Sequence, residues 1–416
     1  MIILRLGWRN LWRNPRRSLI TIGGLAFAFA FLIALVGFGR GLSIQMLRNG
    51  TEMMVGHIQV HDGRYLPDRA LNRTIGGVDG TDWQGLIMRL RRYPKVREAA
   101  PRVYGSALVS KGDRSSGAQL VGVEPASERA LSRVFTAETA AALAARGSII
   151  VGELLALDLG AQVGDKVAVV TPASDGTLGN SLFRITGILH TGIPSFDRSL
   201  AVIRIEDAME QLVLSPGQIH EIAIRIDNPM DAPAVARDLA TRAGLPAGAE
   251  VWSWRELLPQ LSSYVGWTEA LNRLIVALVV LFASMGVLNT MMMATFERVH
   301  EFGVLNAVGT GPASIIGAVL VESFLLVLFG LTGGLGLGWL MMQYMMTYGI
   351  NLGWWMGEVT MVGTRFDPIV KAAWNWQLIP WAAASLAVAA VAASYWPARK
   401  ATQVAPVVAL RAPVMT

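Results

Sequence analysis

The stretch FERVHEFGVLNAVG, residues 296–309, puts four charged or titratable side chains between two long apolar runs. These side chains are Glu297, Arg298, His300 and Glu301. The whole chain of 416 residues is 53% hydrophobic and 16% charged, with a mean hydropathy of +0.43. A soluble domain usually has about a quarter of its residues charged. The composition therefore predicts an integral membrane protein, in which this charged stretch needs a physical explanation.

Four parts of the chain are long and apolar enough to cross a bilayer, which takes about 20 residues in a helix. The predicted spans are residues 18–42, 269–295, 313–345 and 378–397. Residues 43–268, between the first and second spans, mix charged residues, Pro and Gly with short apolar runs. The sequence thus predicts one span, then a large water-soluble domain, then three further spans.

The distribution of Lys and Arg predicts the orientation of these spans. Five arginines lie in residues 1–17, before the first span, and Arg399 and Lys400 follow the last span. Both termini are therefore expected in the cytoplasm, together with residues 296–312 and the tail 398–416.

The domain 43–268 and the loop 346–377 are then expected outside the cytoplasmic (inner) membrane, in the periplasm if the cell has two membranes. Five tryptophans crowd this loop and its borders, as is typical of anchors at a membrane surface. They are Trp354, Trp355, Trp374, Trp376 and Trp381.

Residues 1–17 have the pattern of an amphipathic helix lying in the cytoplasmic interface. Arginines recur at every fourth position and apolar residues take the other side. The first set is Arg5, Arg9 and Arg13, and the second is Leu4, Trp8, Leu11 and Trp12. Asn14-Pro15 is expected to break this helix before the span. The apolar run that follows is too long for a typical cleaved secretory signal.

The segment 43–268 contains short β-branched and apolar runs bounded by turn residues, which predict strands. These runs are residues 56–60, 103–110, 148–152, 166–170, 183–189, 200–205 and 221–226. Helical patterns cover Asp82–Arg92, Glu128–Ala145, Leu154–Val163 and Asp231–Ala243. Strands and helices do not alternate strictly, so the prediction is an α+β domain with its own core and room for two subdomains.

Nothing in the sequence indicates catalysis or a resident cofactor. There is no cysteine, which excludes thiol chemistry and disulfides. His57 and His61 are four apart on a predicted strand, where their rings are well separated, so a polar strand face is expected and no metal site. Three serines, Ser181, Ser195 and Ser199, lack a G-x-S-x-G context. No G-x-x-x-x-G-K-[ST] loop occurs, so the chain is not expected to bind ATP.

The opening stretch and its surroundings resemble the signature region of the MacB/FtsX-type ABC transporter permeases, which include the lipoprotein-releasing (Lol) subunits. The matching residues are Asn289, Met291, Glu297, Arg298, Glu301, Phe302, Gly303, Leu305, Ala307, Val308, Gly309, Glu322 and Ser323. Residues 9–21, 152–170 and 396–411 resemble the family's N-terminal entry, external core domain and C-terminal tail. One departure is Asn306, where the family commonly has a basic residue.

This resemblance implies one span plus three spans around a MacB-like periplasmic core domain. It also makes residues 296–309 a coupling helix that sits in a groove of a separate ATPase dimer. The implied contact residues are Glu297, Arg298, Glu301, Phe302, Gly303, Leu305, Asn306, Ala307 and Gly309. Helical spacing puts Glu297 and Glu301 on one side of this helix. Phe302, Leu305 and Val308 then form an apolar side for a partner. Gly309 is expected to end the helix. The alternative is a solvated connector.

Glu322 is an ionisable residue inside the third span, where a carboxylate is costly and therefore a functional candidate. Hydrogen bonds from Ser323 or a neighbouring span, or an ion pair with Arg298, would satisfy it. A structural role and a dynamic role both remain open, and a proton relay is not expected.

The expected function is mechanotransmission by a non-enzymatic permease that pairs with a second permease chain, identical or related. The partner ATPase would bind ATP and Mg²⁺ and drive movements of the periplasmic domain, to release lipoproteins from the inner membrane to a periplasmic carrier. Five residues of the first span suit an acyl-chain groove or ordinary lipid contact, namely Gly23, Gly24, Phe27, Phe29 and Phe31. The alternatives are efflux of amphiphiles or peptides with a periplasmic adaptor, regulation of a cell-wall hydrolase, and a membrane scaffold outside the ABC family.

Overall fold

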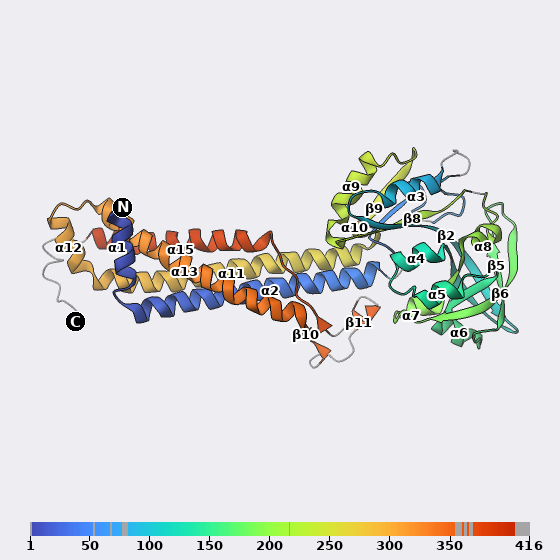
Figure 1. The fold of residues 1–416 in the computed structure, drawn as a ribbon, viewed down its shortest axis with the longest axis horizontal. Helices are drawn as coiled ribbons and strands as arrows, with labels where there is room; N and C mark the ends of the chain where they lie inside the picture. Colours follow the sequence, from blue (N-terminus) through green and yellow to red (C-terminus); the bar gives the residue numbers. More distant parts are fainter. Residues whose placement is uncertain are drawn as a thin grey trace. The chain divides into compact units, whose positions relative to one another are not determined.

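The computed structural model describes residues 2–52, 55–66, 69–76, 82–215, 217–353, 360–361, 364–365 and 369–403. The chain forms two compact units, which are described separately (Figure 1). The helical unit comprises residues 1–43, 266–354 and 369–416, and the mixed unit comprises residues 44–265 and 355–368.

Within the described residues, four helices are long and apolar enough to cross a membrane, as the composition predicts. They are α2 (Pro15–Thr51), α11 (Pro259–Glu297), α13 (Pro312–Thr347) and α15 (Leu378–Thr402). Helices α2 and α11 are longer than the predicted spans, because their polar ends stay helical and belong to the mixed unit. Two short helices, α1 (Ile2–Leu11) and α12 (Val299–Ala307), also belong to the helical unit.

Close packing of α2 and α13 depends on three glycines at every fourth position of α13. A Cβ atom added to Gly330, Gly334 or Gly338 would lie 2.6, 2.8 or 2.8 Å from the nearest atom of α2. In a membrane, where helices gain little from the hydrophobic effect, such small residues let two backbones approach and maximise van der Waals contact. The glycines therefore set the separation of these two helices.

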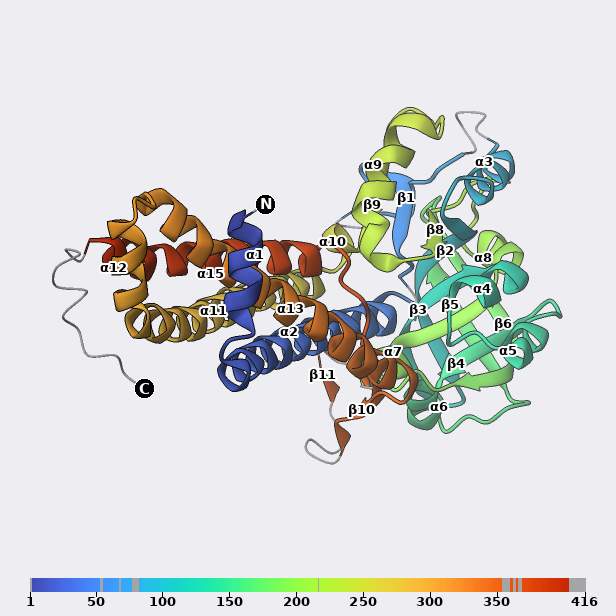
Figure 2. The same cartoon turned by 60° about the vertical axis from the view of Figure 1, so that its left-hand side comes forward.

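Helix α1 crosses the long helices (Figure 2). Its Gly7 lies against α13, where an added Cβ would be 2.7 Å from Val321. Trp8 packs on Phe329 with ring centroids 5.8 Å apart. A turn before Pro15 separates α1 from α2, in agreement with the break predicted at Asn14-Pro15.

The mixed unit is built on nine strands in the order β3-β7-β4-β6-β5-β2-β8-β1-β9. These are β1 (Ile58–Asp62), β2 (Val96–Lys111), β3 (Arg114–Val123), β4 (Ser148–Gly152), β5 (Lys166–Pro172), β6 (Leu178–Leu189), β7 (Leu200–Arg204), β8 (Glu221–Ile226) and β9 (Ala249–Ser253). Two-residue strands pair as β10 (Ile350–Asn351) with β13 (Ile369–Val370), and β11 (Thr360–Met361) with β12 (Thr364–Arg365).

Helices connect and cover these strands. They are α3 (Trp83–Arg91), α4 (Pro125–Leu131), α5 (Ala137–Ala142), α6 (Glu153–Leu159), α7 (Pro194–Ser199), α8 (Ile205–Gln211), η1 (Pro229–Asp231), α9 (Ala232–Arg242) and α10 (Trp254–Leu257). The α+β class predicted from the sequence is thus confirmed.

The topology of the mixed unit is a βαββαβ frame with a barrel inserted into it. The frame consists of two strand–helix–strand segments, β1-α3-β2 and β8-α9-β9. Its four strands lie side by side in the order β2-β8-β1-β9. Strand β2 also pairs with both β3 and β5, so β2, β3, β7, β4, β6 and β5 close into a ring. The single long strand β2 therefore belongs to both parts.

Some element boundaries differ from the predicted ones for local reasons. The predicted helix Glu128–Ala145 is two helices, α4 and α5, because Thr136 caps a new helix by accepting from the Thr139 amide. The predicted helix Leu154–Val163 ends at Leu159, since Gly160 takes a left-handed conformation at φ +59°. Strands β3 and β9 were not predicted.

A buried arginine lies where β2 passes from the frame into the barrel. Arg102 pairs with Val123 of β3 and with Glu221 of β8 in the strand register. Its guanidinium donates to Glu128 at 3.0 and 2.7 Å and to Glu221 at 3.2 Å, and all three side chains are buried. A buried charge without such partners would be strongly destabilising, so this triad fixes the junction.

Charged side chains of the mixed unit surround the end of α2. Glu52 is buried, with its carboxylate 3.3 Å from Arg225 and 3.7 Å from Arg133. His57 is buried beside it and accepts a hydrogen bond from the Ile226 amide at Nδ1. His61 is buried as well. The polar face expected at these positions is thus turned into the unit, where Gln59 is buried as well.

Gly334→Ala is expected to destabilise the helical unit, because the added methyl would lie 2.8 Å from the Ala26 carbonyl oxygen and 2.9 Å from Phe29 Cβ. Overpacking of this kind costs about 1–3 kcal/mol, so the melting temperature of the solubilised full chain should fall by several degrees. Gly336→Ala is the matched control, since nothing lies within 4 Å of its Cβ position. Equal melting temperatures for the two variants would contradict the packing.

Acidification is expected to destabilise the mixed unit, because His57 is buried in its neutral form. Burial, reinforced by the Arg225 charge, lowers the pKa of His57 from 6.5 to about 4. The unfolded chain takes up this proton below about pH 6.5 and the folded chain only below about 4. The free energy of unfolding therefore falls across that window by up to roughly 3 kcal/mol.

Hydrogen exchange of the Ile226 amide in the full chain measures this effect as a protection factor at each pH. His57→Asn keeps an acceptor near the Nδ1 position but takes up no proton, so its protection should depend less on pH. Burial also lowers the pKa of His220, which leaves a residual dependence in the variant. Constant wild-type protection between pH 6.5 and 4 would refute the assignment.

Candidate functional site

The stretch 296–309 contains the end of α11 and a short separate helix, α12, that leads to α13. Helix α11 ends at Glu297, and Arg298 leaves helical geometry at φ −110° and ψ 11° before α12 begins. At the other end Gly309 adopts φ +95°, its amide donates to the Asn306 carbonyl, and the Thr310 amide donates to the Leu305 carbonyl. This is a Schellman ending, which a left-handed glycine makes possible.

A buried ion pair anchors the start of α12 to α13. Arg298 Nη1 donates to Glu322 Oε2 at 2.8 Å, and both side chains are buried. Of the partners considered for Glu322, the structure therefore selects Arg298. The Ser323 hydroxyl makes no hydrogen bond within the described part of the chain.

The two glutamates of the stretch are paired with arginines from the other end of the sequence. Arg17 Nη1 lies 2.7 Å from Glu297 Oε2, and Arg13 Nη1 lies 2.6 Å from Glu301 Oε1. Sequence reasoning did not identify these partners. One sequence signal could have indicated them. The two arginines are four residues apart, and so are the two glutamates, so both pairs can form at once.

The predicted apolar side of α12 is divided between the interior and the surface. Phe302 is buried against the long helices, and Gly303 is buried with it. Val304, Leu305 and Val308 are exposed, Val308 to 80%. Ala307 and Gly309 are exposed as well, and Asn306 is partly exposed. Phe302 thus supports the helix from within the bundle, and the other apolar side chains form its outer face.

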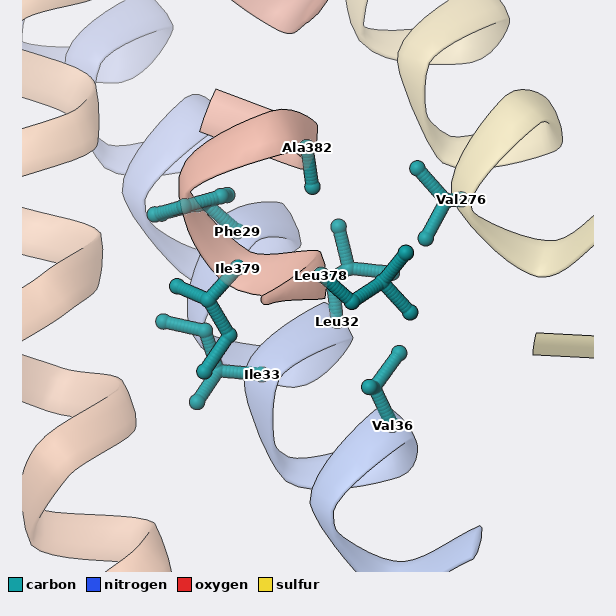
Figure 3. A pocket seen from close by; sticks show the side chains of 8 residues that line it. All are labelled: Phe29, Leu32, Ile33, Val36, Val276, Leu378, Ile379 and Ala382. Carbon is teal, nitrogen blue, oxygen red and sulfur yellow. The ribbon is translucent and has the colours of Figure 1, made fainter. Parts of the chain in front are cut away.

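A second feature of the helical unit is an apolar pocket among α2, α11 and α15 (Figure 3). It is lined by Phe29, Leu32, Ile33, Val36, Val276, Leu378, Ile379 and Ala382, without a polar side chain. The cavity volume is small, about 10 Å³, and the pocket is partly open to the outside. Such a lining suits a hydrocarbon chain and offers nothing to hold a polar or charged group.

The residues named for an acyl-chain groove do not come together. Phe29 lines the pocket, whereas Phe27 and Phe31 are exposed and stack on each other at 6.4 Å. Gly23 and Gly24 face open space, where an added Cβ would meet nothing within 4 Å.

Three of the five tryptophans predicted to anchor the loop 346–377 at a membrane surface are among the described residues. Trp374 stacks on Trp376 with ring centroids 5.0 Å apart, and Trp376 and Trp381 are exposed. Trp354 and Trp355 lie outside the described residues.

In the mixed unit, Glu153, His190 and Asp197 bring three potential ligand atoms within 4.8 Å of one another. Sequence reasoning missed this group because its members come from three separate elements. His190 Nδ1 lies 2.5 Å from Glu153 Oε2. The Asp197 carboxylate accepts from the amides of Thr191 and Gly192 and from the Thr191 hydroxyl. A hydrogen bond between His190 and Glu153 and a loop cap by Asp197 thus account for these side chains.

Two domain families match the chain. The MacB-like periplasmic core domain matches residues 18–242, and the FtsX-like permease C-terminal domain matches residues 273–406. The lipoprotein-releasing system transmembrane protein LolC of Neisseria meningitidis serogroup B is 26% identical over 342 residues, 77% of this chain and 77% of that protein. The macrolide export ATP-binding/permease protein MacB of Vibrio parahaemolyticus is 23% identical over 357 residues, 81% of this chain and 51% of that protein.

Among solved structures, the periplasmic region of MacB from Actinobacillus actinomycetemcomitans covers 49% of this chain and 92% of its own, with a TM-score of 0.33 and 13% identity. The periplasmic core family alone matches more than half of the chain, and the permease family covers most of the remainder. The chain therefore belongs to the MacB/FtsX-type ABC transporter permeases, close to the LolC and LolE subunits.

Proposed function

We propose that this chain is the force-transmitting membrane subunit of an ABC transporter whose ATP and Mg²⁺ are bound by a separate ATPase dimer. The chain would act with a second permease chain, with both termini and α12 in the cytoplasm and the mixed unit in the periplasm. Its work would be the release of lipoproteins from the inner membrane to a periplasmic carrier.

The outer face of α12 is the observation that carries this proposal. Val304, Leu305 and Val308 are exposed on a helix whose two ends are fixed by a buried ion pair and a glycine cap. This helix lies outside the long apolar segments, so lipid tails are not expected to cover its apolar face. A groove on a partner protein is a suitable environment for such a face.

The connections of α12 suit it to pass on movement rather than substrate. Its base is held to α13 by Arg298 and Glu322, and Phe302 packs among the long helices. Helices α2 and α11 each contribute residues to both units without a break in the helix. A tilt of these helices would therefore be felt by the mixed unit.

The choice of cargo rests on the apolar pocket and on the relatives. A pocket without polar side chains suits the acyl chains of a lipoprotein, and a LolC protein matches this chain over 77% of both lengths. Efflux of amphiphilic compounds with a periplasmic adaptor is the second candidate, because a MacB protein matches 81% of the chain.

Val308→Asp is expected to abolish copurification of an ATPase with the chain, because it places a charge at the centre of the apolar contact face. Val308 is 80% exposed, so the variant should keep its wild-type melting temperature. Val163→Asp is the matched control, since Val163 is 59% exposed in the mixed unit, away from α12 in the sequence. If the wild-type chain brings down no ATPase, or if Val308→Asp binds it normally, the proposal fails.

Mass spectrometry of the purified complex is expected to find triacylated lipoprotein. Leu32→Arg would introduce a charge into the pocket and should reduce that bound material without loss of the ATPase. A complex with no lipoprotein but with a copurifying periplasmic adaptor would instead favour efflux.

A further inference from the structure

We infer that Arg13 and Arg17 are positioning residues that hold α12 through Glu301 and Glu297. These two carboxylates then work within their own chain rather than as contacts to the partner ATPase. The inference rests on the proposed function and changes the assignment of its contact residues.

The geometry of the four side chains has the form of a two-point clamp. Arg17 lies in the first turn of α2 and reaches Glu297, the last residue of α11, at 2.7 Å. Arg13 lies in the turn before α2 and reaches Glu301, in the first turn of α12, at 2.6 Å. One ion pair is therefore made on each side of the break at Arg298, and the N-terminal turn spans that break.

The turn that carries these arginines is itself firmly held. The Ser18 hydroxyl donates to the Leu11 carbonyl at 2.6 Å, which ties the start of α2 to the end of α1. Leu11 is buried in the same apolar cluster as Phe302. The arginines thus project from a supported turn, and less side-chain freedom is lost when the pairs form than in an ordinary surface pair.

Both glutamates already have a cationic partner within the chain. Glu301 lies between two cations, since Arg298 Nε is 3.9 Å from the same carboxylate group. Arg17 and Glu297 are only 25% and 35% exposed as side chains. With both carboxylates neutralised, the face of α12 that is offered outward is the apolar one.

Charge exchange within each pair tests this directly, with ATPase activity of the full complex as the readout. Arg17→Glu, Glu297→Arg, Arg13→Glu and Glu301→Arg are each expected to lower the rate about fivefold, the effect of an exposed pair near its upper strength. The double exchanges R17E/E297R and R13E/E301R should restore most of it. Arg16→Glu is the matched control, because Arg16 makes no ion pair within the described residues, and it should have little effect.

The outcomes separate the two roles of the glutamates. If a partner cation binds them, the double exchanges stay as defective as Glu297→Arg and Glu301→Arg alone, which would overturn the inference. Single exchanges without effect would overturn it as well. A wild-type chain that brings down no ATPase defeats the proposed function, and this inference with it. Failure of the rescue in a complex that still copurifies its ATPase defeats only the inference.

A second variant covers the case in which the exchanged pairs fail to fold. The chain contains no cysteine, so R17C/E297C introduces the only two thiols. A short, reducible bis-methanethiosulfonate linker should join them and restore the ATPase rate that the unlinked variant lacks, although both charges are gone. The pair R16C/E297C should link poorly. Efficient linking without restored activity would show that the carboxylate itself is needed, and would overturn the inference.

Discussion

The buried ion pair between Arg298 and Glu322 is the constraint on which the helical unit depends. Neither charge is tolerable alone in an apolar interior, since removing one partner of such a pair costs several kcal/mol. Because Arg298 occupies the break between α11 and α12, the pair fixes three helices at once. The direction in which α12 leaves α11, and hence the face it exposes, follows from this contact.

A buried arginine with carboxylate partners also fixes a junction in the mixed unit. Arg102 lies between Glu128 and Glu221 where β2 passes from the frame to the barrel. Hydrophobic packing could hold either junction with similar strength, but a buried arginine with fixed donors also specifies orientation. A buried arginine with carboxylate partners thus lies at each of these two junctions, between α11 and α12 and between the frame and the barrel. The rest of each unit is held mainly by apolar packing.

Sequence reasoning succeeded where a property is local. Hydropathy located the four long helices, alternating β-branched runs located seven of the strands, and Gly309 ends α12 as its conformational freedom suggested. It failed where the property is set by distant parts of the chain. The partners of Glu297 and Glu301 lie 280 and 288 residues away, and the burial of Phe302 depends on helices that no local pattern places around it. Strand β3 was missed because it is rich in Gly, Ser and Gln, and β2 and β7 provide its pairing.

The register at Arg102 has a consequence for how proteins with this architecture can diverge. Arg102 lies directly opposite Glu221, so the polypeptide enters the barrel and returns from it at adjacent points of the frame. An insertion whose ends are neighbours can change in length, or be exchanged for another, with little strain on its host. The βαββαβ frame, which receives the ends of α2 and α11, can stay constant while the barrel varies. Natural selection can therefore alter the barrel without rebuilding the frame or the two long helices that lead into it.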